Sequence, residues 1–250
     1  MMEIPDGLIF ALQNATKSLV LTGAGMSAES GVPTFRDAQN GLWAKFRPEE
    51  LATPEAFNEH PQIVWDWYTE RRENIDKARP HAGHHMLVEL EQYVERLLVV
   101  TQNVDGLHQQ AGSADVVELH GNIMHSTCSK TGKPIESDWI TSNPGHPPVS
   151  PHHPLGLARP AVVWFGEQLP AGAMDRAMAA ALTCDVCFSI GTSTLVQPAA
   201  SLPFIALNAG AVVIEINPIR TSLSQVANFS LQTTAAEALT TIIAKLADGK

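Results

Sequence analysis

The apolar residues of this 250-residue chain gather in short runs that are separated by longer stretches of mixed character. Five runs rich in Val, Ile and Leu have the length and continuity of strands that are buried on both faces. These runs span residues 18–21, 97–101, 116–119, 186–190 and 211–216. Apolar residues at helical spacing occupy other segments, among them residues 84–96 and 234–246. This alternation predicts an α/β fold with a Rossmann-like, doubly wound parallel sheet.

Two segments do not fit the alternation of strands and helices. Residues 35–77 contain helical stretches broken by prolines, and residues 121–158 are loop-like, rich in proline and almost without periodicity. We therefore assign residues 1–34, 78–120 and 159–250 to the sheet and its helices. The two remaining segments, one helical and one loop-like, are expected to be insertions into that domain.

A glycine-rich turn follows the first predicted strand, where residues 23–36 read GAGMSAESGVPTFR. Gly23 permits a tight turn, and Gly25 removes a Cβ that would block the approach of a phosphate. Ala28 stands at the third small position of the dinucleotide-binding fingerprint. Because backbone N–H groups at a helix start favour anions, the turn from Gly23 through Ala24 predicts a pyrophosphate site. A glycine turn without a ligand is the alternative interpretation.

Further motifs extend this signal along nearly the whole chain. They are Thr101-Gln102-Asn103-Val104-Asp105, Leu119-His120-Gly121, Arg159-Pro160-Ala161-Val162-Val163-Trp164-Phe165-Gly166-Glu167 and Gly191-Thr192-Ser193. Together with the glycine turn, and in this order, they resemble the signature of the sirtuins, a family of NAD-dependent lysine deacylases. The resemblance implies a Rossmann domain with two insertions that form a small domain, and an active cleft between the two.

The resemblance also implies a reaction that consumes NAD as a co-substrate and transfers no hydride. The acyl group moves from lysine to the ribose, which yields nicotinamide, 2′-O-acyl-ADP-ribose and free lysine. His120 would be the general base, a role that suits an imidazole near neutral pH. Asn103 would share the catalytic centre. Without the resemblance, a packed histidine at a loop mouth is the alternative for His120.

The residues that the resemblance assigns to NAD binding are Gly23, Ala24, Gly25, Ala28, Phe35, Arg36, Gln102, Asn103, Asp105, Gly191, Thr192, Ser193 and Asn217. Arg36 would pair with a phosphate, and Phe35 would shield the reactive ribose carbon. Asn217, after the last apolar run, would bind the adenosine ribose. Turn formation after a strand is the alternative role for Asn103 and Asp105.

A second stretch concerns the acyl group. Tyr68 and Arg71 are three residues apart on a predicted helix and share a face, so a phenol and a guanidinium can grip one carboxylate. Tyr-x-x-Arg at this place resembles the sirtuin-5-like class and the bacterial CobB-type desuccinylases. The pair would read succinyl- or malonyl-lysine, beside deacetylase activity, and Ala52 would leave room for the longer chain. A solvated helix face is the alternative.

The apolar segment around Val163 has a separate predicted role. In the family, the backbone at Val163, Phe165 and Gly166 pairs with the substrate peptide as an added strand. An ordinary buried strand is the alternative, and the two are compatible.

The chain departs from the family at its metal site. Sirtuins usually hold a structural zinc with two Cys-x-x-Cys pairs, whereas Cys128 here has Thr131 at the partner position and no cysteine follows before Cys184. A tetrathiolate site is impossible, and we expect a module without zinc. A mixed site remains as the alternative, with the ligands Cys128, His125, His152 and His153.

Composition narrows the class of partners. The net charge of −10 disfavours nucleic-acid binding, and three cysteines argue against a disulfide framework. Neither a 20-residue apolar run nor a secretory signal is visible, so we expect a cytoplasmic enzyme that acts on acyl-lysine proteins away from membranes. Two other functions stay open: a non-catalytic sensor of NAD or ADP-ribose, and a protein ADP-ribosyltransferase.

Overall fold

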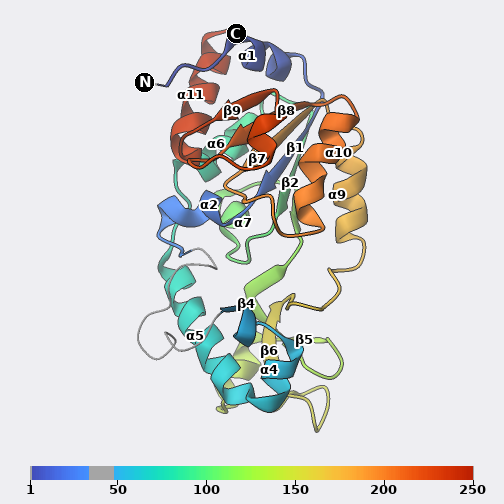
Figure 1. Ribbon diagram of the computed structural model, residues 1–250. Coiled ribbons are helices and arrows are strands. Elements are labelled where there is room, and N and C mark those ends of the chain that lie inside the picture. Colours follow the sequence, from blue (N-terminus) through green and yellow to red (C-terminus); the bar gives the residue numbers. More distant parts are fainter. Residues whose placement is uncertain (1, 34–47, 250) are drawn as a thin grey trace.

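The computed structural model describes residues 2–33 and 48–249. Within these residues, parallel strands form one sheet in the order β3-β2-β1-β7-β8-β9 (Figure 1). The strands are β1 (Lys17–Thr22), β2 (Arg96–Thr101), β3 (Val116–Glu118), β7 (Val186–Ile190), β8 (Val212–Ile216) and β9 (Phe229–Leu231). The strand order reverses between β1 and β7, which is where sheets of this type open a crevice at their carboxyl ends. The predicted α/β fold with a Rossmann-like sheet is confirmed.

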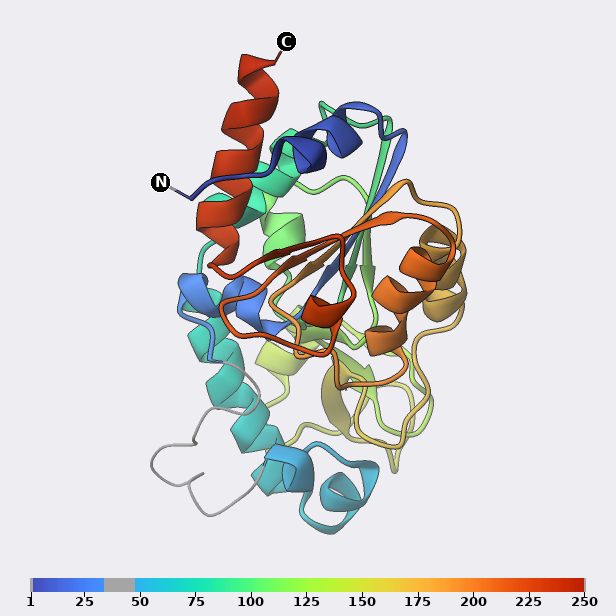
Figure 2. The same ribbon diagram turned by 45° about the horizontal axis from the view of Figure 1, so that its top comes forward.

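Helices cover both faces of the sheet (Figure 2). One apolar layer contains α1 (Asp6–Gln13), α6 (Ala82–Leu90) and α11 (Ala235–Asp248), and the other contains α9 (Ala173–Ala181) and α10 (Leu202–Asn208). The periodicity in residues 234–246 is confirmed by α11, but the helix predicted over 84–96 ends at Leu90. Among the described residues, no helix has both the length and the apolar character needed to cross a bilayer.

A second, smaller sheet lies below the carboxyl edge of the first (Figure 1). It consists of β4 (Gly121–Cys128), β5 (Pro134–Ile135) and β6 (Ala158–Val162), paired antiparallel in the order β5-β4-β6. The expectation that residues 121–158 are loop-like is therefore wrong where β4 and β5 lie. The burial of β4 is irregular, and its register with β6 shifts between Asn122 and Ser126, so no clean period-2 signal is visible in the sequence.

Helices complete the small domain beside this sheet. They are α3 (Pro48–Leu51), α4 (Pro54–Glu59), α5 (Pro61–Lys77) and α8 (Ser137–Ser142). Phe57, Val64 and Trp67 from the helices share one buried cluster with Ile123 and Trp164. Arg72 ties α5 to β4, because its Nε donates to the carbonyl of Ile123 at 2.6 Å and its Nη2 to that of His125 at 2.9 Å. The remaining short helices are α2 (Ala24–Ser27), η1 (Ala28–Ser30), α7 (Leu107–Ala111), η3 (Ala199–Ser201) and η4 (Leu223–Gln225).

Candidate active site

The carboxyl ends of the central strands lie level with one another. Thr22 at the end of β1 is in register with Thr101 of β2 and Ile190 of β7, and Ile190 is in register with Ile216 of β8. The loops that leave these ends therefore meet at one edge, facing the small domain (Figure 1). They carry most of the predicted nucleotide-binding residues, from Gly23 to Asn217.

Two glycine turns pack backbone against backbone at this edge. Gly25 N donates to the Gly191 carbonyl at 2.9 Å, and a Cβ on Gly25 would lie 2.7 Å from the Gly191 Cα. Gly191 adopts a φ of +61°, and a Cβ there would lie 2.3 Å from Met26 N. The predicted reason for Gly25 was access for a phosphate; the structure adds that any side chain would push the two turns apart. The cradle that results is lined by backbone and suits a nucleotide diphosphate.

The other residues of the first turn are placed differently. Ala24 opens α2 and is half-buried, whereas Ala28 begins η1 and is exposed. Phe35 and Arg36 lie outside the described residues. Their predicted roles remain predictions.

Asn103 and Asp105 belong to one buried network with Ser27. The Asn103 side-chain amide donates to the Gly23 carbonyl at 3.0 Å and to Ser27 Oγ at 3.1 Å. Ser27 Oγ in turn donates to Asp105 Oδ2 at 2.7 Å, and Asp105 Oδ1 accepts from Leu107 N at 3.0 Å. Burial raises the pKa of Asp105, while these hydrogen bonds act in the opposite direction. The network locks the loop after β2 onto the first glycine turn.

A second chain of hydrogen bonds runs from His108 through Thr22 and Thr101 to the backbone of Asn103. Burial lowers the pKa of His108 to about 4, so its imidazole is neutral at pH 7. His108 Nε2 lies 3.0 Å from Thr22 Oγ1, which donates to Thr101 Oγ1 at 2.8 Å. Thr101 Oγ1 also accepts from Asn103 N at 3.0 Å. No role for Ser27, Thr22 or His108 is predictable from the sequence, because these pairings join residues about 80 positions apart and no local pattern signals them.

His120 follows β3 and is half-buried at the same edge. Its Nδ1 lies 3.0 Å from the Gln102 carbonyl oxygen. Because a carbonyl only accepts, Nδ1 must carry the hydrogen, and the neutral ring then presents Nε2 as an unprotonated base. Burial lowers the pKa of His120, with the bond to Gln102 acting against it. The histidine is thus held in the tautomer that a general base requires.

The other half of this sheet edge is built around Glu215 and Asn217. Asn217 Nδ2 donates to the Thr192 carbonyl at 2.8 Å, while Ser193 is exposed beside it. The buried carboxylate of Glu215 accepts from Ser230 Oγ at 2.8 Å and also from the hydroxyls of Thr221 and Ser224. These bonds fix the loop after β8. In the sequence, the only signal for this role is that Glu215 interrupts the apolar run 211–216.

The segment after β6 is bonded to the backbone of His120. Val163 N donates to the His120 carbonyl and Phe165 N to the Ala52 carbonyl, both at 2.9 Å. Phe165 is 49% exposed, and Gly166 has a φ of +85°. β6 itself ends at Val162, so residues 163–166 are not a buried strand. Ala52 is thereby joined to the predicted peptide-binding segment through one backbone hydrogen bond.

Tyr68 and Arg71 lie together on α5, as predicted. Tyr68 is 4% exposed, and its hydroxyl accepts a hydrogen bond from Trp164 Nε1 at 3.0 Å. Burial raises the pKa of Tyr68 to about 12, with nearby Arg71 lowering it in part. Burial also lowers the pKa of Arg71, whose guanidinium carbon lies 5.0 Å from the centroid of the Trp67 ring. The two groups form a desolvated donor pair that suits an anion.

The residues of the candidate mixed metal site serve other contacts. His152 Nε2 lies 2.6 Å from the Pro134 carbonyl, and His153 Nδ1 accepts from Leu155 N at 3.1 Å. Cys128 is buried, and His125 is exposed. Over the described ranges, no three His, Cys, Asp or Glu side chains gather as a metal site would require. The arrangement of these side chains therefore does not fit a structural zinc site.

The chain is similar in sequence and in fold to known proteins. Residues 23–198 match the model of the Sir2 family. A protein of Ralstonia nicotianae named NAD-dependent protein deacylase is 48% identical over 93% of both chains. The solved structure of a Sir2 homologue in complex with NAD superposes with a TM-score of 0.89 at 41% identity, covering 99% of this chain and 95% of that one. A Sir2 structure bound to acetylated peptide gives a TM-score of 0.86 at 27% identity, over 98% of both chains.

Proposed function

This chain is a member of the Sir2 family and an NAD-dependent protein deacylase, and on that premise we propose that it prefers lysine acyl groups that end in a free carboxylate. Succinyl- and malonyl-lysine are the proposed substrates, and acetyl-lysine is a weaker one. The products are nicotinamide, 2′-O-acyl-ADP-ribose and free lysine. The enzyme assignment replaces the alternative of a non-catalytic sensor.

One observation carries the preference for an acidic acyl group. Tyr68 is a buried phenol whose oxygen accepts from Trp164, and Trp164 is its only hydrogen-bond partner among the residues that the structure describes. Its own O–H is left as a donor, and a buried donor without an acceptor is costly. The Arg71 guanidinium, also desolvated, acts on the same hydroxyl. A carboxylate bound beside Tyr68 would accept the phenol hydrogen and would be attracted by the nearby guanidinium charge of Arg71.

The arrangement at the sheet edge supports the catalytic roles that we propose for its residues. Bound NAD supplies an electrophilic ribose carbon, from which nicotinamide departs, and the ribose hydroxyl that receives the acyl group. His120 Nε2 takes the proton from that ribose, because Nδ1 is committed to the Gln102 carbonyl. The loop from Gln102 to Asp105, which Ser27 holds in place, is the proposed lining of the nicotinamide pocket. The backbone cradle of Gly23, Gly25 and Gly191 holds the diphosphate.

The direction of the His120 pKa shift gives an expected pH profile. Burial lowers this pKa, so the unprotonated base persists below pH 6.5, where a free histidine would be half protonated. Since only the unprotonated ring accepts a proton, we expect the acid limb of kcat/KM for an acyl peptide to be centred below pH 6.5. Initial rates at fixed ionic strength measure this, and an acid limb centred above pH 7 would contradict it.

A panel of acyl-lysine peptides tests the proposed preference. Succinyl-lysine and butyryl-lysine form the matched pair, since both acyl chains have four carbons and only succinyl ends in a carboxylate. We expect kcat/KM for succinyl to exceed that for butyryl by about tenfold or more, the effect of charged hydrogen bonds. Mass spectrometry of the products completes the test. Equal rates on the two peptides, or ADP-ribose left on the protein, would overturn the proposal.

A further inference from the structure

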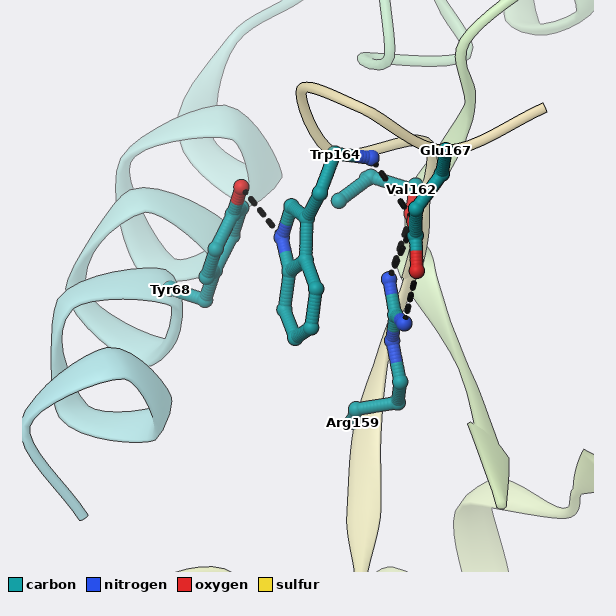
Figure 3. Close-up of polar contacts among 5 residues, drawn as sticks. All are labelled: Tyr68, Arg159, Val162, Trp164 and Glu167. Carbon is teal, nitrogen blue, oxygen red and sulfur yellow. Dashed lines mark hydrogen bonds and ion pairs between the residues drawn. The ribbon is translucent and has the colours of Figure 1, made fainter. Parts of the chain in front are cut away.

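The hydrogen bond between Trp164 and Tyr68 joins two parts of the small domain that are 96 positions apart in the chain (Figure 3). Trp164 is 2% exposed and follows β6, while Tyr68 lies on α5. The ring centroids are 6.3 Å apart and tilted by 38°, so the rings are not stacked and the N–H···O contact sets their relation. Figure 3 shows the indole nitrogen pointing at the phenol oxygen.

The direction of this bond has a chemical consequence. An indole N–H only donates, so Trp164 must be the donor and the Tyr68 oxygen the acceptor. A phenol has a single hydrogen, which is then turned away from Trp164 toward other acceptors. Trp164 therefore fixes Tyr68 as a donor. A donor at this point favours an acyl group that ends in an oxygen acceptor over one that ends in a methyl group.

Trp164 is also held by residues other than Tyr68. Its backbone N donates to Glu167 Oε2 at 2.9 Å, and the Arg159 guanidinium lies over its ring, 3.4 Å from the centroid. Arg159 also forms a two-point ion pair with Glu167, at 2.5 and 2.9 Å, as Figure 3 shows. Phe57 contacts the indole at a centroid distance of 5.3 Å. The indole thus has little freedom to turn its N–H elsewhere.

The position of Trp164 in the chain links it to the peptide segment. Its neighbours Val163 and Phe165 make the backbone bonds to His120 and Ala52. The Phe165 side chain is 49% exposed, whereas the Trp164 side chain is buried. One short stretch therefore contains both the predicted peptide-binding residues and the buried indole.

We propose that Trp164 is a positioning residue for acyl-group selectivity, whose indole N–H holds the phenol of Tyr68 as a hydrogen-bond donor to the acyl carboxylate. The inference rests on the proposed function, since it assumes that Tyr68 reads that carboxylate. It adds a residue that contacts Tyr68 rather than the substrate.

A double-mutant cycle tests this inference. Trp164→Phe removes the N–H but keeps an aromatic ring for Arg159 and Phe57, and Tyr68→Phe removes the phenol oxygen. The readout is the ratio of kcat/KM for succinyl-lysine to that for butyryl-lysine. Because both substrates are measured on one preparation, loss of folded enzyme cancels. Trp65→Phe, a buried tryptophan on α5 that contacts a different cluster, is the matched control.

We expect Tyr68→Phe to lower the ratio about tenfold, and Trp164→Phe about fivefold, as the loss of single hydrogen bonds does. The double variant should match Tyr68→Phe alone, because Trp164 acts only through Tyr68. Trp65→Phe should keep the wild-type ratio. If Trp164→Phe yields no folded enzyme, Trp164→Leu serves in its place, since its side chain also has no hydrogen-bond donor.

The outcomes separate the inference from the proposed function. A ratio that falls with Tyr68→Phe but not with Trp164→Phe overturns the role of Trp164 alone. Additive losses in the double variant do the same, because they show an effect that bypasses Tyr68. A ratio that neither variant changes overturns the proposed function as well.

Discussion

Replacement of His120 by alanine is expected to lower steady-state deacylation by about a thousandfold, the middle of the range for loss of a general base. The reason is specific to the geometry, because the Gln102 carbonyl fixes the tautomer that leaves Nε2 free to accept a proton. Initial rates of acyl-peptide consumption at pH 7.5 measure the loss. Exchange of labelled nicotinamide into NAD should persist in the variant, since departure of nicotinamide does not need the base.

A second histidine provides the control for this result. His125 lies on β4, five positions along the chain from His120, and its side chain is exposed. His125→Ala should keep deacylation within about twofold of the wild type, as surface substitutions usually have small effects. Loss of less than tenfold in His120→Ala, or loss of nicotinamide exchange along with deacylation, would contradict the assigned role.

Replacement of Arg71 by methionine is expected to abolish desuccinylation while deacetylation stays measurable. The substitution keeps much of the side-chain length but removes the planar cation that the acyl carboxylate would meet beside Tyr68. We expect a loss of about a hundredfold or more in kcat/KM for succinyl-lysine, which corresponds to about 3 kcal/mol. Parallel assays with succinyl and acetyl peptides measure it.

The adjacent arginine is the matched control for Arg71. Arg72 is the next residue on α5, but its guanidinium is bound to the Ile123 and His125 carbonyls and to Ser126 Oγ. Arg72→Met should therefore lower the thermal midpoint and depress both activities together, with their ratio unchanged. Equal loss of the two activities in Arg71→Met would show that Arg71 is also structural, and would contradict its role in acyl recognition.

The sequence was sufficient for the parts of this molecule that depend on local patterns. Runs such as residues 186–190 predicted parallel strands because a strand buried on both faces must be apolar throughout. The order of short motifs, from Gly23 to Ser193, predicted the family, which the comparisons confirm. The small sheet was missed, because β4 carries an irregular register and mixes buried Ile123 with polar residues.

Local patterns also explain why Tyr68 and Arg71 were paired correctly on one helix face. Spacing of three residues on a helix determines which side chains are neighbours, whatever the rest of the fold does. Spacing does not say what lies opposite that face. The structure places Trp164 there, and its N–H decides which way the phenol hydrogen points.

By itself, then, the sequence determined the α/β architecture, the family and the candidate residues at each strand end, since periodicity and motif order are properties of neighbours in the chain. Only the tertiary structure decided the His120 tautomer, the contact of Gly25 with Gly191, and the chain of hydrogen bonds from His108 to Asn103. Each of these is a contact between residues far apart in the chain. Such contacts arise when separate loops converge at one sheet edge, and no local pattern encodes the distance between them.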